Sequence, residues 1–466
     1  MKKVLFLLSV SIILLSAPLK TALAQKFSFE KAWNTVLINS DALAAEKQNI
    51  ERSLYLQDAA SDLFFPSVSL HANYTRLDKA VRVRPSEVIE SMPIDSINQA
   101  FGIKTTDLDS LFTSTLTERD VFTSSIRALW PLYTGGRINA AQGIAKAQHD
   151  EASFLLTMKQ SEKFEDLVKY YFAVVLSEQV LQTRIDVEQG LNQHYENALK
   201  LEQQGQINKL ERLQAQVSLN KSQVELKKSL RDTEIAQVAL AKLLKINEKA
   251  VPTATLFVNE SLPKMSYFIE KTLSDFPALK VLDAKKEQAK GLINIEKGKY
   301  YPEVYLYGNY NLYEEDNLAS QIAPNWEVGI GISIPIFDNS GRSGKTKAAH
   351  SSVMQVTYLQ AQAIQDLSVL VEKTYREANQ SLEEYQGLES SLALSDENLL
   401  LRRRAFTQGL STSIEVVDAQ LFVASIKTQR LVAAYQYMIS LSKLLALSTD
   451  IHTFKHYQSY QGIEVK

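Results

Sequence analysis

Two acidic side chains, Glu415 and Asp418, are the most distinctive candidates for chemistry in the sequence. They follow Gly409 and lie three residues apart, a spacing that places both carboxylates on one face of a helix. Two interpretations are open. The acids could complement the positive end of a helix dipole, or copies from several chains could gather negative charge around one narrow opening. In the first half of the chain Glu211 corresponds to Glu415, but no acid corresponds to Asp418.

Other chemistry-bearing patterns are weak. Gly344-Lys345-Thr346 resembles the end of a phosphate-binding loop, but that loop needs a glycine where Asn339 stands, so nucleotide binding is disfavoured. The 6 histidines form no H-E-x-x-H motif, and the absence of cysteine excludes disulfides, thiolate nucleophiles and cysteine-ligated metals. No Ser/His/Asp set stands out. We therefore expect neither an enzyme nor a cofactor or metal site.

Composition excludes further classes. The chain has 466 residues, of which 45% are hydrophobic and 22% charged, with a net charge of −2. A polytopic helical membrane protein would need repeated apolar runs of about 20 residues. A disordered chain would be less hydrophobic. The near-neutral charge gives no basic face for nucleic acid.

The N-terminus has the pattern of a secretory signal peptide. Lys2 and Lys3 precede an apolar run, and Ala22-Leu23-Ala24 forms a small-x-small cleavage site. The run is too short for a transmembrane anchor. We expect residues 1–24 to be removed and the protein to leave the cytoplasm.

The remaining sequence is an internal repeat. Residues 65–70 recur as 301–306, and Gln204-Gly205 recurs as Gln408-Gly409. Pro131 to Gly205 and Pro335 to Gly409 both span 74 residues, so the two halves contain segments of equal length.

The prolines locate the helices and one unequal loop. None occurs between Pro131 and Pro252 or after Pro335, which predicts long helices over 137–204 and 342–408. Pro66 to Pro131 spans 65 residues, whereas Pro302 to Pro335 spans 33. The surplus of 32 residues is placed in a loop, 77–118.

Short strands accompany the helices. In 326–336 large apolar residues alternate with small or polar ones, and 303–313 alternates in the same way. Segments 66–76 and 120–133 form a second, more weakly patterned pair. About 10 residues suit a tilted strand across a membrane, but four strands cannot close a barrel that needs at least about eight. Because open edges are not tolerated in lipid, several chains must contribute to one barrel, and three would give twelve strands.

These motifs together resemble the TolC-like outer-membrane efflux family. Three pairs of motifs carry the resemblance. The first pair opens strands at Pro66 and Pro302, and the second runs from Pro131 and Pro335 to the Gly-Arg that follows each. The third pair is the turns at Gly205 and Gly409, each followed by the pattern L/V-x-A-Q. It covers nearly the whole mature chain. It implies a homotrimer, a 12-stranded outer-membrane β-barrel, a long α-helical periplasmic barrel and an equatorial belt.

The resemblance also implies roles for the two turns. They are the tips that dock a periplasmic adaptor: Gly205 in the first half, and Gln408, Gly409, Leu410, Ser411 and Thr412 in the second, which matches the docking motif more closely. Glu415, Asp418 and Glu211 would line the periplasmic entrance.

Two neighbouring positions concern the gate at that entrance. The family's aromatic residue before the turn is retained as Phe406, but Ser411 stands where the family commonly has arginine. The charged latch of the entrance is therefore expected to be incomplete. Arg402, Arg403 and Arg404 could form a patch that faces the adaptor, but they are interpreted first as cations that complement a helix C-terminus.

The predicted fold is mainly α with a small β part. The predicted divisions are the signal peptide 1–24, a first repeat 25–245 with return helix 208–245, a connector 246–266, a second repeat 267–447 with return helix 412–447, and a tail 448–466. The connector and tail would form the belt.

The predicted function is a passive exit duct in the outer membrane that reaches into the periplasm. It would carry small molecules or polypeptides from a periplasmic adaptor and an inner-membrane transporter, which supplies the energy. The alternative is a secreted coiled-coil protein that tethers envelope layers. The apolar face of 326–336 favours the duct, since a soluble coiled coil has no use for a lipid-facing strand.

Overall fold

The computed structural model describes residues 25–84, 109, 112–314, 320, 323–337, 339–459 and 462–465. The predicted signal peptide and much of the predicted loop 77–118 lie outside these residues. Within the described part, the prediction of a mainly helical chain with few strands is confirmed. No helix there is long and apolar enough to cross a membrane.

Helices carry most of the chain. They are α1 (Phe29–Asn39), α2 (Asp41–Asp62), α6 (Arg137–Gln203), α7 (Lys209–Leu244), α8 (Met265–Asp275), α9 (Pro277–Gly298), α11 (Arg342–Thr407), α12 (Ser413–Leu447), the 3₁₀ helix η1 (Ile451–Thr453) and α13 (Phe454–Ser459). The absence of proline lets α6 and α11 run for 67 and 66 residues, against an average of about 11–12 for a globular helix.

The strands are short except in one sheet. They are β1 (Gln25–Phe27), β2 (Ser67–Arg76), β3 (Val81–Val83), β4 (Ser114–Thr117), β5 (Asp120–Thr134), β6 (Ala250–Pro252), β7 (Phe257–Asn259), β8 (Glu303–Glu314), β9 (Trp326–Ser333) and β10 (Gly462–Glu464). The antiparallel pair β3–β4 occupies part of the segment predicted as a loop.

The chain divides into two compact units, each built from separated segments. The first contains the segments up to Lys47, from Phe154 to Leu279 and from Gln362 onward. The second contains Gln48–Ser153 and Lys280–Ala361. Each unit therefore draws on both halves of the repeat.

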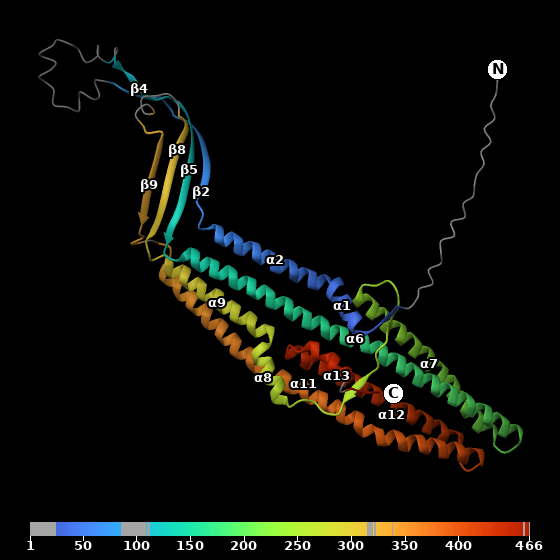
Figure 1. Cartoon of the computed structure of the whole chain (residues 1–466). Helices are drawn as coiled ribbons and strands as arrows, with labels where there is room; N and C mark the ends of the chain where they lie inside the picture. The colour runs from blue at the N-terminus through green and yellow to red at the C-terminus, as the bar shows by residue number, and fades with distance from the viewer. Residues whose placement is uncertain are drawn as a thin grey trace, which may run out of the picture. The chain divides into compact units, whose positions relative to one another are not determined.

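The second unit contains a four-stranded sheet in the order β2-β5-β8-β9, shown side by side in Figure 1. All its neighbouring strands are antiparallel. The two halves of the chain meet where β5 pairs with β8. Among the described strands, β2 and β9 each have one neighbour, so the sheet has two open edges.

One predicted strand was too long. The alternation extended to residue 336, but β9 ends at Ser333, which pairs with Glu303 at the start of β8. Pro335 has no N–H to donate to a ladder, so the pairing cannot continue through it. Ile336 and Phe337, beyond the end of β9, are 92% and 93% exposed.

The two faces of the sheet differ in chemistry. Val328, Ile330 and Ile332 on β9 are 62–72% exposed, and Val68 and Leu70 on β2 continue the same apolar face. The opposite face carries Ser69, His71, Asn73, Thr123, Ser125, Asn309, Asn311 and Glu327. An apolar face of this size without cover requires a partner surface or lipid.

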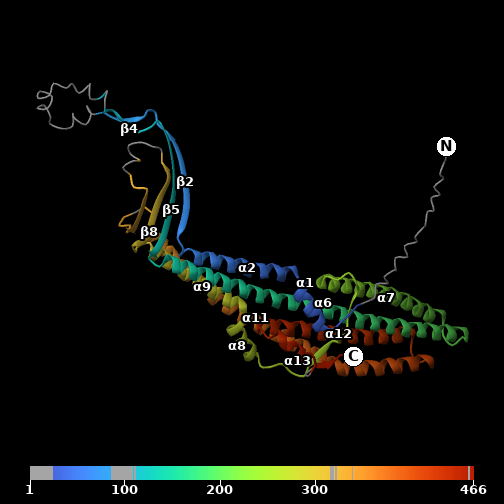
Figure 2. The ribbon, with the colours of Figure 1, turned by 45° about the horizontal axis from the view of Figure 1, so that its top comes forward.

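The first unit contains α7, α12 and the later parts of α6 and α11, which form two helical hairpins, α6–α7 and α11–α12, visible from two directions in Figures 1 and 2. Their interface is apolar, with Val187 and Leu191 of α6 packed against Leu219 of α7 and Val417 of α12. Small residues such as Ala424 let the helix backbones approach.

The predicted connector and tail pair with each other beside these helices. β7 and β10 form an antiparallel pair, and β1 pairs in parallel with β6. Two tyrosines attach these strands to the long helices. Tyr437 on α12 donates to Asn259 Oδ1 (2.8 Å), and Tyr171 on α6 donates to the Phe27 carbonyl (2.8 Å).

Candidate functional site

The candidate site consists of the two turns that end the helical hairpins. Gly205 (φ +72°) and Gly409 (φ +73°) adopt the left-handed conformation, which glycine accepts at low cost. In each turn the N–H of the residue after the glycine closes the last helical turn: Gln206 donates to the Leu201 carbonyl and Leu410 to the Ala405 carbonyl, both at 2.9 Å. The two turns therefore share one glycine-dependent backbone form.

The second turn presents a polar and an apolar group to solvent. Gln408 is exposed and Leu410 is 77% exposed. Thr412 begins α12 as its N-cap, and with Glu415 it forms a capping box, in which each side chain accepts from the other residue's backbone N–H.

Glu415 is held inside its own hairpin. Its carboxylate accepts from Ser411 Oγ (2.6 Å) and the Thr412 N–H (2.9 Å), and it pairs with Arg402 Nη1 (2.9 Å). The Ser411 hydroxyl, followed by the Thr412 N–H and Arg402, lowers the pKa of Glu415 to about 2. The carboxylate thus stays ionised, with much of its charge compensated. Asp418, one turn further along α12, is exposed.

Glu211 has a different role from its counterpart. Its Oε2 accepts from the backbone N–H of Ser413, the first residue of α12, at 2.6 Å. A carboxylate from the first half of the chain therefore caps a helix in the second half, where the helix dipole favours negative charge.

A buried polar cluster lies behind the turns, and we name its members His194, Ser413, Arg403 and Gln420 the tip cluster. His194 Nε2 and Ser413 Oγ are 2.7 Å apart, and Arg403 donates to Gln420 Oε1. Phe406 is 2% exposed, and its ring centroid lies 4.6 Å from that of His194. Burial, with a smaller contribution from Arg403, lowers the pKa of His194 to about 4.

Sequence reasoning missed the tip cluster. It treated Arg402 and Arg403 as cations at a helix end, whereas one pairs with Glu415 and the other is half-buried against Gln420. A signal was present in Gly190, a glycine inside a long helix, which costs about 1 kcal/mol relative to alanine. A Cβ there would lie 2.8 Å from Arg403 and 2.9 Å from Gln420.

Each hairpin also contains its own ion pair, with opposite orientation. In the first, Glu202 on the outgoing helix pairs with Arg212 on the return helix. In the second, Arg402 on the outgoing helix pairs with Glu415 on the return helix. The two ion pairs occupy non-equivalent positions of the repeat, since Glu202 corresponds to Phe406 and Arg402 to Ala198, but each joins the two helices of its own hairpin.

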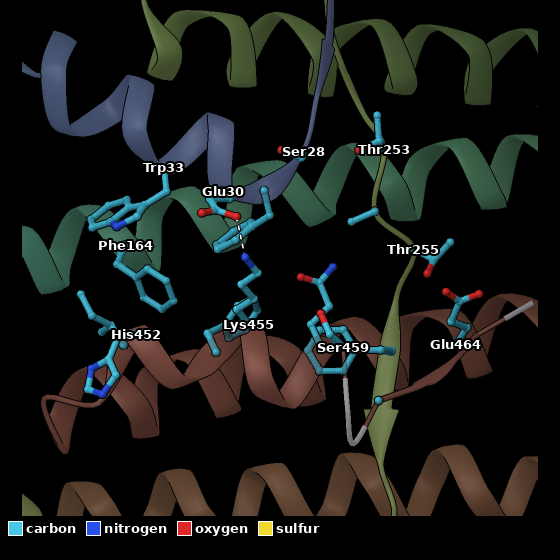
Figure 3. A pocket seen from close by; sticks show the side chains of 17 residues that line it. Ser28, Glu30, Trp33, Phe164, Thr253, Thr255, His452, Lys455, Ser459 and Glu464 are labelled. Carbon is cyan, nitrogen blue, oxygen red and sulfur yellow. Dashed lines mark hydrogen bonds and ion pairs between the residues drawn. The ribbon is translucent and has the colours of Figure 1, made fainter.

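A pocket of about 670 Å³ lies elsewhere in the first unit, between α1, α6, β7 and the C-terminal segment (Figure 3). Trp33 and Phe164 form one aromatic wall, with ring centroids 5.5 Å apart. Lys455 forms an ion pair with Glu30 across it (2.7 Å). The ion pair joins α1, near the start of the described chain, to α13, near its end. Within the described residues no group of three His, Cys, Asp or Glu side chains could hold a metal.

Comparison with known proteins gives a consistent result. A family model described as "Outer membrane efflux protein" matches residues 32–244 and 268–448. No curated protein sequence matches the chain.

Among solved structures, one of CusC, described in terms of folding and transmembrane channel formation, is 16% identical, with 90% of this chain and 91% of that chain covered and a TM-score of 0.72. The outer membrane protein VceC of Vibrio cholerae is 14% identical over 91% and 95%, with a TM-score of 0.69. The open state of the MtrE outer membrane channel of Neisseria gonorrhoeae is 17% identical over 91% and 89%, with a TM-score of 0.69. At these identities the likeness concerns the fold.

Proposed function

The chain belongs to the outer membrane efflux protein family, and from this premise we propose that three copies form a passive exit duct across the outer membrane. Members of the family are channels of the outer membrane rather than enzymes.

The sheet is the observation that carries the proposal. Its strands present Val328, Ile330 and Ile332 on an exposed face, and among the described strands its edges β2 and β9 each pair on one side only. In lipid each unpaired group costs several kcal/mol, so the edges must be closed. Pairing β9 of one copy with β2 of the next closes them, and three copies give the twelve strands that the family resemblance implies.

The alternative of a secreted coiled-coil tether does not account for this sheet. A tether gains nothing from isoleucines at 62% and 67% exposure on an edge strand, which would promote aggregation in water. A lipid-facing barrel wall uses the same residues.

The hairpin turns are proposed as the docking tips for a periplasmic adaptor, which connects the duct to an inner-membrane transporter. The proposal is supported by the exposed Leu410 and Gln408 beside a backbone fixed by Gly409. The docking residues would be Gly205 in the first turn and residues 408–412 in the second.

The entrance is proposed to be lined by Asp418 and Glu415, with Glu211 and Phe406 behind them. Because Glu415 is paired with Arg402, Asp418 contributes the less compensated charge. Ser411 takes part through its hydrogen bond to Glu415 rather than through a charge of its own.

The test of the duct is the mass and conductance of the purified protein. In mild detergent we expect the mass of a trimer, and in a planar bilayer we expect discrete ion currents. A monomer that retains its β-structure signal and gives no current would refute the proposal.

A further inference from the structure

Two tyrosines stand out on the polar face of the sheet. Tyr305 and Tyr307 on β8 point to the side opposite Val328 and Ile330, since each pairs with the intervening residues of β9. Tyr305 is paired with Gly331 and Tyr307 with Gly329. In the proposed duct this face lines the lumen.

Both rings lean across the neighbouring strand. A Cβ at Gly329 would lie 2.6 Å from Cζ of Tyr307, and a Cβ at Gly331 would meet the ring of Tyr305 in the same way. Only glycine leaves room for this arrangement. Glycine weakens a strand interior, and its presence marks a close approach. The two glycines therefore serve to hold the rings against β9.

The rings keep one side open. Tyr307 is 40% exposed, Tyr305 is half-buried, and their centroids lie 6.2 Å apart. A ring that contacts backbone with one side and faces water with the other is a surface on which a flat solute can stack.

The neighbouring row of the sheet does not select a charge sign. Arg127, Asn309 and Glu327 lie level with one another on β5, β8 and β9, so a cation and an anion flank the row. Selection by the tyrosines would therefore depend on the flat aromatic shape of a solute rather than on its charge.

We propose that Tyr305 and Tyr307 form a stacking platform for planar aromatic solutes that pass through the duct. Three copies would place six such rings in two adjacent rows around the lumen. This inference rests on the proposed function, because it assigns the polar face to the lumen.

The test is block of single-channel current by small probes. Proflavine, a planar aromatic cation, and naphthalene-1,5-disulfonate, a planar aromatic anion, should both reduce the current of the wild-type protein. Tetraethylammonium, which has no aromatic ring, should not do so at the same concentrations. Block by both cations and not by the aromatic anion would overturn the proposal in favour of simple charge selection by Glu327.

Substitutions then separate stacking from strand stability. Tyr305→Phe with Tyr307→Phe keeps the rings and should preserve block. Tyr305→Leu with Tyr307→Leu should raise the half-blocking concentration about tenfold. If the double leucine variant does not assemble, Tyr307→Leu alone should raise it about threefold. The matched control is Tyr310→Leu, on the same strand but on the apolar face opposite Trp326, which should leave block unchanged.

The duct and the stacking platform are refuted by different results. A wild-type protein without current refutes the duct and the platform together. Normal current with the same half-blocking concentration in the wild-type and leucine variants refutes the platform and leaves the duct intact.

Discussion

The imidazole of His194 on α6 and the hydroxyl of Ser413 at the start of α12 lie 2.7 Å apart in a buried position, although they are 219 residues apart in sequence. This contact joins the two halves of the repeat directly behind the hairpin turns. A buried hydrogen bond of this kind is modest in net energy but costly to leave half-made. Burial and the nearby Arg403 make a charged imidazole costly here, so the tip depends on His194 remaining neutral.

Acid should destabilise the protein through His194. The pKa of His194 is about 4 in the folded chain and 6.5 when unperturbed, so between these values the unfolded state binds more protons. The contribution of His194 to the free energy of unfolding should be fully present above pH 6.5 and should fall as the pH decreases toward 4, by at most roughly 3 kcal/mol. Thermal unfolding at a series of pH values measures this. Glu165, whose pKa burial raises to about 7, changes stability in the opposite direction over the same range, so the contribution of His194 is read as the difference between the wild-type and His194→Gln profiles. Exposed His350→Gln should leave the wild-type profile unchanged.

Multivalent cations should block the entrance through Asp418. With Glu415 compensated by Arg402, we expect Asp418→Asn to remove more of the block than Glu415→Gln, and the double variant to abolish it. Hexaamminecobalt(III) added to the periplasmic side in planar-bilayer recordings measures this. Full cation sensitivity in the double variant would assign both acids to the start of α12 alone.

Gly409 should tolerate asparagine better than alanine. No heavy atom lies within 4 Å of a Cβ at this position, so the cost of Gly409→Ala is backbone strain alone, about 1–2 kcal/mol. Asparagine accepts the left-handed conformation more readily and should cost less. Hydrogen exchange of residues 400–415 reports the local opening. Gly387→Ala, in the exposed interior of α11, should instead stabilise its helix slightly.

A charge on the apolar face of the sheet should prevent insertion. Ile330→Lys places an ammonium group where the proposal puts lipid, at a cost of about 2–4 kcal/mol near the bilayer centre. The yield of oligomer after refolding into vesicles should fall. Ser125→Lys, on the polar face, is the control and should refold normally. Equal losses from both variants would contradict the assignment of the two faces.

The segment 77–118 is predicted to be extracellular. Its 32 surplus residues suit the outside, where loops of outer-membrane barrels are longer. Protease added to intact cells should cut within this segment first. Cutting that requires permeabilised cells would place the segment on the periplasmic side.

Much of the fold could be predicted because it depends on local signals. The absence of proline predicted α6 and α11, and the alternation in 303–313 and 326–336 predicted β8 and most of β9. The family resemblance, drawn from six weak motifs in order, is confirmed by the family match over both halves. Local patterns sufficed because each repeat contributes the same element types at matching positions.

The tip cluster could not be predicted for the opposite reason. Helical periodicity indicates which face of α6 is buried, but not that His194 meets Ser413 or that Glu211 caps α12. Those contacts depend on how four helices are placed around each other. The roles of Arg402 and Arg403 were hidden in the same way, because three consecutive arginines point in three directions around a helix.

The reversed ion pairs of the two hairpins have a consequence for anything that binds the turns. Glu202–Arg212 and Arg402–Glu415 give the hairpins opposite charge order, so a ring of three chains would present six tips of two alternating kinds. A partner that recognises charge would distinguish neighbouring tips and would therefore have three equivalent binding sites rather than six. The number of equivalent binding positions is thus set by the charge order of the two ion pairs, and not by the number of helices.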